Sequence, residues 1–376
     1  MRRFAAVAAL SAGGLLHSRF PTHCEKKPAA APIVVVGSLN ADIIIEIDRM
    51  PVEGETISSR NPDTGYMIPG GKGANQAVGV ARLKPDSPTE FVCQFGSDSH
   101  AKTLRATLEE NRVGISACGT VDKPSGQAFI LLNSKGSNSI ILSAAANGAW
   151  PKQLTPETVA AIQSAKVVLL QREVPEHVNE AVAAVASSAG VLILQDVGGE
   201  ERPMSDRLVS QIDYLFPNET ELARLTGLPT ETEEQIVFAA RLLQAKGCKN
   251  VGVTLGADGS VLLTEDGQLL KQGSLPVPGG QVVDTTGAGD SYRAAFAVAV
   301  IEGKSMQDCM RFAAATGALT VSRHGAIPSL PTRAEVEALL GGEEAGATSS
   351  TTTTVTHHHH TTSHATTTAT TTTVTA

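Results

Sequence analysis

Short apolar runs alternate with longer helical patterns along most of this chain. Residues 33–36, 167–170 and 191–194 are continuous apolar runs, which predict strands that are buried on both faces of a parallel sheet. Helical patterns between such strands are typical of βαβ units, so the chain is predicted to adopt an α/β fold. We expect a doubly wound, mostly parallel sheet that is flanked by helices.

A second set of extended segments breaks this rhythm. Residues 43–47 predict a strand, and two further apolar runs flank a turn-rich stretch at 133–138, as in a hairpin. Strands that no helix separates are expected outside the core sheet. We therefore predict that residues 39–68 and 125–143 form a small β-sheet lid on a body that spans residues 33–340.

Both ends of the chain lack the pattern of a packed fold. Residues 1–32 begin with arginines and an Ala/Leu run and have no acidic residue before Glu25, which is typical of a targeting peptide. We expect delivery to an organelle, a plastid or a mitochondrion, after its removal; a secretory signal or a cytoplasmic protein is the alternative. The Thr/His-rich residues 343–376 offer little apolar surface to bury and are predicted to be disordered.

Composition limits the classes of partner. The 376 residues carry a formal net charge of −8, which indicates neither a nucleic-acid partner nor an acidic membrane surface. No apolar run is long enough to cross a membrane. The cysteines have no Cys-x-x-Cys spacing, so Cys93, Cys118, Cys248 and Cys309 are expected to be reduced thiols that pack in the interior.

The clearest chemical signal lies near the C-terminal end of the body. The valines at 282–283 predict a strand that ends at Asp284, and small residues at 287–289 lead into an apolar helix. Unpaired amides and the helix dipole make such a helix N-terminus an anion site, and Asp290 lies beside it as a candidate proton acceptor. Alternatively, the glycines only form a turn, and Asp290 or Ser291 caps the helix.

Polar side chains also follow the first strand and a second glycine turn. Asn40 and Asp42 are two residues apart, so in an extended chain they face the same side. The glycines at 70–73 allow the backbone to approach a ligand closely, and Lys72 and Asn75 add donors. The turn is not a P-loop because a glycine follows the lysine, and no Gly-x-Gly-x-x-Gly follows the first strand. For Asn40 and Asp42, a structural Asx turn is the alternative.

More polar residues stand at or just past the ends of later strands. They are Glu173, Asp196, Asn218, Glu221 and Thr254. Any one of them could be a helix cap or a surface group. Because ligands of open α/β sheets bind at the carboxyl ends of the strands, all five together predict one site at that edge.

Four motifs occur in order along the body. They are Gly-Ser-Leu-Asn-Ala-Asp at 37–42, Gly-Gly-Lys-Gly-Ala-Asn-Gln at 70–76, Pro-Asn-Glu-Thr-Glu at 217–221 and Asp-Thr-Thr-Gly-Ala-Gly-Asp at 284–290. Together they resemble the PfkB family of carbohydrate kinases, on its ribokinase-like branch. The resemblance implies the doubly wound α/β fold with a β-sheet lid, and a homodimer that forms through the lid.

The resemblance also implies a role for each matching position. The sugar would be held by Asn40, Ala41, Asp42, Gly71, Lys72, Gly73, Ala74, Asn75, Glu173 and Asp290. ATP would be bound by Asp196, Asn218, Glu221, Thr254, Leu255, Gly256, Ala257, Asp258, Gly259, Gly289 and Asp290. Asp290 would be the general base, with Gly287, Ala288 and Gly289 as the anion hole. Mg²⁺ would be linked to Asn218 and Glu221, and a potassium ion to Asp284, Thr286, Thr320, Arg323, Gly325 and Ser329.

Three positions depart from the family pattern. Asp196 stands where bacterial relatives often have Asn, Ala314 where an adenine-contacting His or Asn is common, and His324 where Lys is usual. The expected activity is ATP-dependent phosphorylation of D-ribose at its 5-hydroxyl. The alternatives are another sugar or nucleoside kinase of the family, such as a fructokinase, and a catalytically silent homologue that binds sugar. An oxidoreductase on a Rossmann-like sheet is a third.

Overall fold

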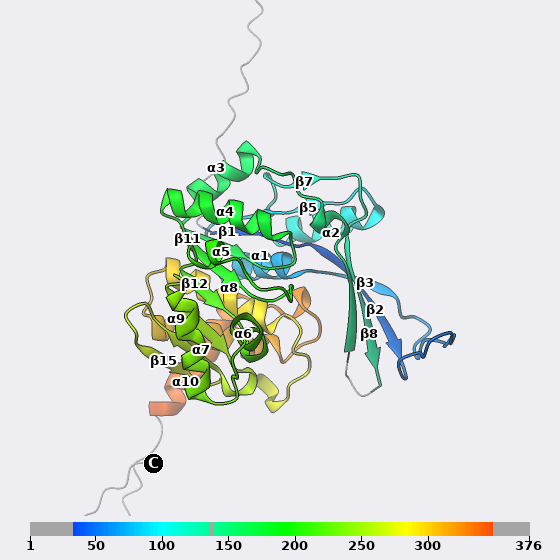
Figure 1. Ribbon diagram of the computed structural model, residues 1–376. Helices are drawn as coiled ribbons and strands as arrows, with labels where there is room; N and C mark the ends of the chain where they lie inside the picture. Colours follow the sequence, from blue (N-terminus) through cyan, green and yellow to red (C-terminus); the bar gives the residue numbers. More distant parts are fainter. Residues whose placement is uncertain (1–32, 135–137, 349–376) are drawn as a thin grey trace, which may run out of the picture.

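One large sheet organises the protein (Figure 1). The computed structural model describes residues 33–134 and 138–348. Nine strands form the sheet: in spatial order β15 Leu269–Gln272, β14 Ser260–Leu263, β13 Asn250–Thr254, β12 Tyr214–Phe216, β11 Leu192–Asp196, β10 Val167–Leu170, β1 Ile33–Val36, β4 Thr89–Val92 and β6 Val113–Gly114. Strands β13 to β6 pair in parallel, and β14 and β15 add antiparallel edge strands. The predicted α/β fold with a doubly wound, mostly parallel sheet is confirmed.

Helices cover both faces of this sheet. One face packs against α1 Lys72–Leu83, α2 Ser99–Glu110, α8 Ala288–Ile301, α9 Met306–Thr320 and α10 Arg333–Thr348. The other packs against α3 Pro156–Ser164, α4 Glu176–Ala189, α5 Asp206–Val209, α6 Glu219–Thr226 and α7 Glu233–Ala245. The strand β1 serves both cores, since Val35 enters the first and Val34 and Val36 enter the second. This two-sided burial explains why the central strands have no polar face.

A second sheet projects from the body (Figure 1). Its strands, in spatial order, are β3 Tyr66–Gly70, β2 Asn40–Ile47, β8 Gly126–Asn133 and β9 Asn138–Ser143. Strands β8 and β9 form the predicted hairpin, and β8 runs parallel to β2. Two short strands, β5 Gln94–Phe95 and β7 Gly119–Thr120, pair beside it. Because β2 begins only four residues after β1 ends, the small sheet grows directly from the carboxyl edge of the large one.

Two predictions about secondary structure are wrong. No strand forms at residues 282–284, where Val282 is 56% exposed. The segment is instead a loop, in which the amides of Val283 and Asp284 both donate to the carbonyl of Val321. The predicted disorder is wrong for residues 343–348, which extend α10 because the Ala and Glu residues there favour a helix. The targeting peptide, residues 1–32, and the rest of the tail, 349–376, lie outside the described residues.

Candidate active site

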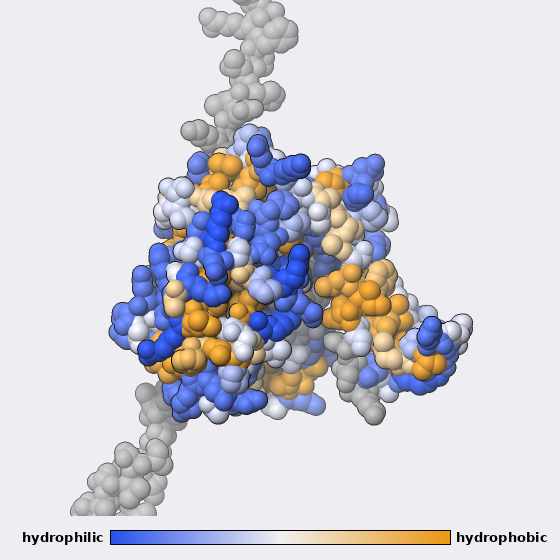
Figure 2. Space-filling view, viewed as in Figure 1, coloured by the Kyte–Doolittle hydropathy of each residue, from blue (hydrophilic) through white to orange (hydrophobic). Residues whose placement is uncertain are grey.

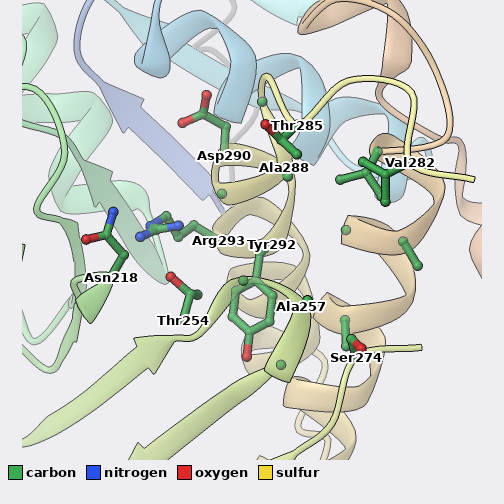
Figure 3. A pocket seen from close by; sticks show the side chains of 18 of the residues that line it. Asn218, Thr254, Ala257, Ser274, Val282, Thr285, Ala288, Asp290, Tyr292 and Arg293 are labelled. Atoms are coloured by element: carbon green, nitrogen blue, oxygen red, sulfur yellow. The ribbon is translucent and has the colours of Figure 1, made fainter. Parts of the chain in front are cut away.

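A cavity of about 810 Å³ opens at the carboxyl edge of the large sheet. Its wall comes from the ends of β11, β12 and β13 on one side and from the start of α8 on the other (Figure 3). Lys72 also lines the cavity. As predicted, polar residues from successive strand ends are gathered at one edge, as the geometry of a parallel sheet requires.

The glycine turn ends one wall of this cavity. Gly287 is the N-cap of α8 and has a left-handed backbone with φ of 77°. No side chain caps this helix N-terminus, and the Ser291 hydroxyl donates to the carbonyl of Ala288 instead. The alternative, in which Asp290 or Ser291 caps the helix, is therefore wrong. The Ala288 amide donates to the carbonyl of Thr285 at 3.2 Å, so the anion site beside Asp290 depends on the other amides of the first turn and on the positive end of α8.

Asp290 is held by two amide side chains of α1. Asn75 Nδ2 donates to Asp290 Oδ2 at 2.8 Å, and Gln76 Nε2 donates to Oδ1 at 3.1 Å. Burial is the largest effect on this carboxyl and raises its pKa. The nearby Asp196 also raises it, whereas Lys72 and the two amides lower it. A raised pKa suits a carboxylate that must accept a proton near neutral pH.

The predicted sugar residues surround the junction of β1, β2 and α1. Asn40 Oδ1 accepts from Asn147 Nδ2 at 2.7 Å, and the main-chain amide of Lys72 donates to Glu173 at 3.1 Å. Asp42 Oδ1 is buried without a hydrogen bond. A side chain at Gly70 would collide with the Asp42 carboxylate, since an added Cβ would lie 2.0 Å from Oδ2.

Charge is concentrated at this junction. Burial raises the pKa of Asp42 to about 7, with the carboxylates of Glu173 and Asp290 adding to the rise. Burial acts to lower the pKa of Lys72, but Asp290, Asp196 and Glu173 outweigh it and the pKa is raised. The Lys72 ammonium is thus a fixed positive charge among acidic side chains.

The predicted nucleotide residues lie on the opposite wall. Thr254, Gly256, Ala257 and Gly259 line the cavity, whereas Leu255 packs against the core that contains α4 and α7. Asp258 lies in the same turn, outside the lining. A chain reversal of this kind presents backbone and small side chains to a flat ligand.

Asn218 and Glu221 form a capping box at the start of α6. Asn218 Oδ1 accepts from the amide of Glu221 at 2.8 Å, and Glu221 Oε2 accepts from the amide of Asn218 at 2.9 Å. The helix-cap alternative is therefore realised here. Both residues also line the cavity, so the cap fixes a carboxylate at its edge.

Three of the predicted potassium residues, Asp284, Thr286 and Gly325, meet where two loops are tied together. Asp284 accepts from the amide of Thr286 at 2.9 Å through Oδ1 and from the amide of Gly325 at 2.9 Å through Oδ2. Thr320 and Ser329 are fully buried, and their hydroxyls donate to the main-chain carbonyls of Thr316 and Ala326. Arg323 points its side chain to Glu335, so only its backbone remains for an ion. In the described residues, no cluster of three or more His, Cys, Asp or Glu side chains forms a metal site.

The sequence reasoning missed three buried residues of the site. Gln76 bridges two carboxylates, because its Nε2 also donates to Asp196 at 2.9 Å. Gln171 Nε2 donates to Gln76 Oε1 at 2.7 Å and fixes the orientation of that amide. Arg293 lies 3.1 Å from Asp196 and is 4% exposed. One signal was available, since Arg293 is a cationic side chain within the mostly apolar helix α8, and a buried charge requires a partner.

The helices of the described part of the chain include none that is long and apolar enough to cross a membrane.

Comparison with known proteins identifies the family. The pfkB family carbohydrate kinase model matches residues 30–333. The chain is 47% identical to ribokinase from Arabidopsis thaliana over 315 residues, 83% of this chain and 81% of that one. It is 34% identical to ribokinase from Haemophilus influenzae over 81% of this chain and 96% of that one.

Solved structures agree with this result. The structure of Arabidopsis thaliana ribokinase complexed with ribose and ATP aligns with a TM-score of 0.78 and 47% identity, over 83% of this chain and 99% of that one. Ribokinase from Thermotoga maritima aligns with a TM-score of 0.74 and 33% identity, over the same shares of the two chains. The chain belongs to the pfkB family of carbohydrate kinases.

Proposed function

We propose that this chain is an ATP-dependent kinase that phosphorylates D-ribose at its 5-hydroxyl. The observation that carries the proposal is the position of Asp290, which lies between the cavity wall of α8 and the amides of α1. A sugar at the β1–β2–α1 junction and a nucleotide in the cavity would meet at this carboxylate. The 47% identical relative whose structure contains ribose and ATP supports both ligands.

The chemistry follows from the charges at the site. Asp290 accepts the proton of the attacking hydroxyl, which its raised pKa makes easier near neutral pH. The open amides at the start of α8 stabilise the charge on the transferred phosphoryl group, and one such donor is worth about 3–4 kcal/mol in other enzymes. Asn40 and Asp42 align the sugar, and Lys72 balances the negative charge around it.

Two cations fit the donor groups of the site. Mg²⁺ prefers oxygen ligands. The Glu221 carboxylate, which the capping box holds at the cavity edge, fits that chemistry together with Asn218. A bound Mg²⁺ would supply charge neutralisation of the nucleotide phosphates. Potassium would lie between the loops that Asp284 ties together, where main-chain oxygens of residues 284–286 and 323–329 would be its ligands.

The small sheet is proposed to act as a lid and as the interface of a homodimer. Its outer strand β9 exposes Ile140, Ile141 and Leu142, which are 52%, 60% and 54% accessible. Figure 2 shows apolar residues gathered on the projecting sheet. A second copy of the chain would cover such a surface. Delivery to an organelle, with residues 1–32 as the address, remains part of the proposal.

A substrate panel tests the function. We expect kcat/KM with ATP to be highest for D-ribose among D-ribose, D-fructose and nucleosides, and Asp290→Asn to reduce kcat at least 100-fold. A higher kcat/KM for fructose or a nucleoside would instead support another kinase of the family. Equal, near-zero turnover in wild type and Asp290→Asn would support the silent binding homologue.

A further inference from the structure

One buried arginine in the cavity has no role in the reaction described above. Arg293 lies on α8 one turn after Asp290, so both side chains emerge from the same side of the helix. Figure 3 shows its guanidinium between Asp290 and the pair Asn218 and Thr254. Among the described residues that line the cavity, Lys72 and Arg293 are the two cationic side chains.

The guanidinium is fixed from three directions. Its Nη2 donates to the carbonyl of Phe216 at 2.8 Å, which anchors it to the end of β12. Its Nε lies 3.1 Å from Asp196 Oδ1 as an ion pair but outside hydrogen-bond geometry. Its Nη1 lies against the glycine turn, since a Cβ on Gly289 would stand 2.7 Å from it. Glycine at 289 is thus what allows the cation to approach the anion site.

Charge balance distinguishes two readings of this arrangement. If Arg293 only held α8 against the sheet, its ion pair with Asp196 would be sufficient to explain its position. However, the side chain lies against Gly289 at the start of α8, where an anion is expected, and its buried Nε makes no hydrogen bond. A guanidinium presents several donors in one plane to a phosphate, and it keeps its charge when buried.

We propose that Arg293 is a phosphate-binding residue that contacts the terminal phosphate of ATP beside the Gly287–Gly289 turn. This inference rests on the proposed kinase function. It adds a second cation to the site, on the opposite side of Asp290 from the sugar. Asp196 holds the guanidinium in place while the site is empty of nucleotide, which accounts for an acidic residue at a position that faces a phosphate pocket.

Binding measurements with three variants test the assignment. Arg293→Met removes the cation with similar bulk, and Arg293→Gln retains a donor for the Phe216 carbonyl. Arg172→Met is the matched control, because Arg172 is also buried but donates to the carbonyls of Glu200 and Pro203, away from the cavity. Calorimetry would compare a non-hydrolysable ATP analogue with adenosine, which lacks phosphates.

We expect both Arg293 variants to bind the ATP analogue about 10- to 100-fold more weakly, the range for hydrogen bonds to charged groups, and to bind adenosine as wild type does. Arg172→Met should unfold at a lower temperature and keep the wild-type ratio of the two affinities. An equal loss for both ligands, or no loss, in an Arg293 variant would overturn the assignment. If the Met variant does not fold, the Gln variant decides by the same criterion. If the wild-type protein does not phosphorylate ribose with ATP, the proposed function itself is overturned.

Discussion

Replacing Gln76 by Met removes the amide that bridges the two carboxylates of the site. Gln76 is fully buried, and its Nε2 lies 3.1 Å from Asp290 Oδ1 and 2.9 Å from Asp196 Oδ2. Methionine fills a similar volume, so the substitution chiefly removes hydrogen bonds. The bond to Asp290 stabilises the ionised form of that carboxyl, and without it the pKa of Asp290 rises further above the usual carboxyl range.

The size of the effect follows from the contact. A hydrogen bond to a charged group contributes about 1.5–3 kcal/mol, which corresponds to about a 10- to 100-fold shift of the protonation equilibrium. Since only the ionised base accepts the proton, the acid limb of kcat/KM should move to higher pH. Below its midpoint, kcat/KM for ribose should fall by about that factor, and the loss should shrink as the pH is raised.

The assay is a pH profile of kcat/KM for wild type, Gln76→Met and Gln195→Met. Gln195 is a matched control because it is fully buried and donates to the main-chain carbonyl of Asp196, not to Asp290. We expect its acid limb to coincide with that of wild type. A folded Gln76→Met enzyme that loses the same factor at every pH would refute the reasoning, since that result would assign Gln76 to packing alone.

Four further outcomes are expected. The native Asp42 pKa of about 7 lies above an unfolded value of about 3.9, so the native state holds this proton more tightly and the stability of the wild type falls as pH rises between the two values. The Tm of Asp42→Asn relative to wild type should therefore increase from pH 4 to 8, while its KM for ribose rises. A Tm difference that stays constant with pH would contradict this. Potassium chloride should raise the Tm of wild type more than sodium chloride and lose this advantage in Asp284→Asn, because Asp284 joins the two loops of the proposed site. Burial raises the pKa of Cys248 and of Cys309 to about 12, so iodoacetamide at pH 7.5 should label them by mass spectrometry only after denaturation. Gly289→Ala should lower kcat about 10-fold or more, because a Cβ there would push Arg293 aside, and unchanged kinetics would exclude this crowding.

The sequence predicted most of the fold because its signals are local. Continuous apolar strands such as Val167–Leu170 are recognisable without knowing their neighbours, and the glycine turns mark two helix starts. The segment 282–284 has residues that favour a strand, but its amides donate to the carbonyl of Val321 and it pairs with no strand in the described part of the chain, because pairing is a property of the whole sheet. Exposure of Val282 and Val283 is the physical consequence.

Site residues were recognisable where a motif carried them and invisible where only the fold did. Asp290, Asn75 and Lys72 occur in short glycine-containing motifs, whose residues are unusual outside a binding site. Gln76 and Gln171 are 95 positions apart, and no local pattern shows that one amide orients the other.

The residues that the sequence did not reveal share one role, which is to stabilise several charged side chains in the interior. Burial raises the pKa of Asp290, and repulsion from the carboxylate of Asp196 adds to the rise. The amide of Gln76 donates to both carboxylates, and the guanidinium of Arg293 forms an ion pair with Asp196. The environment of Asp290 therefore depends on Gln76, which ends the motif at 70–76, and on Gln171 and Arg293, which lie outside all four motifs.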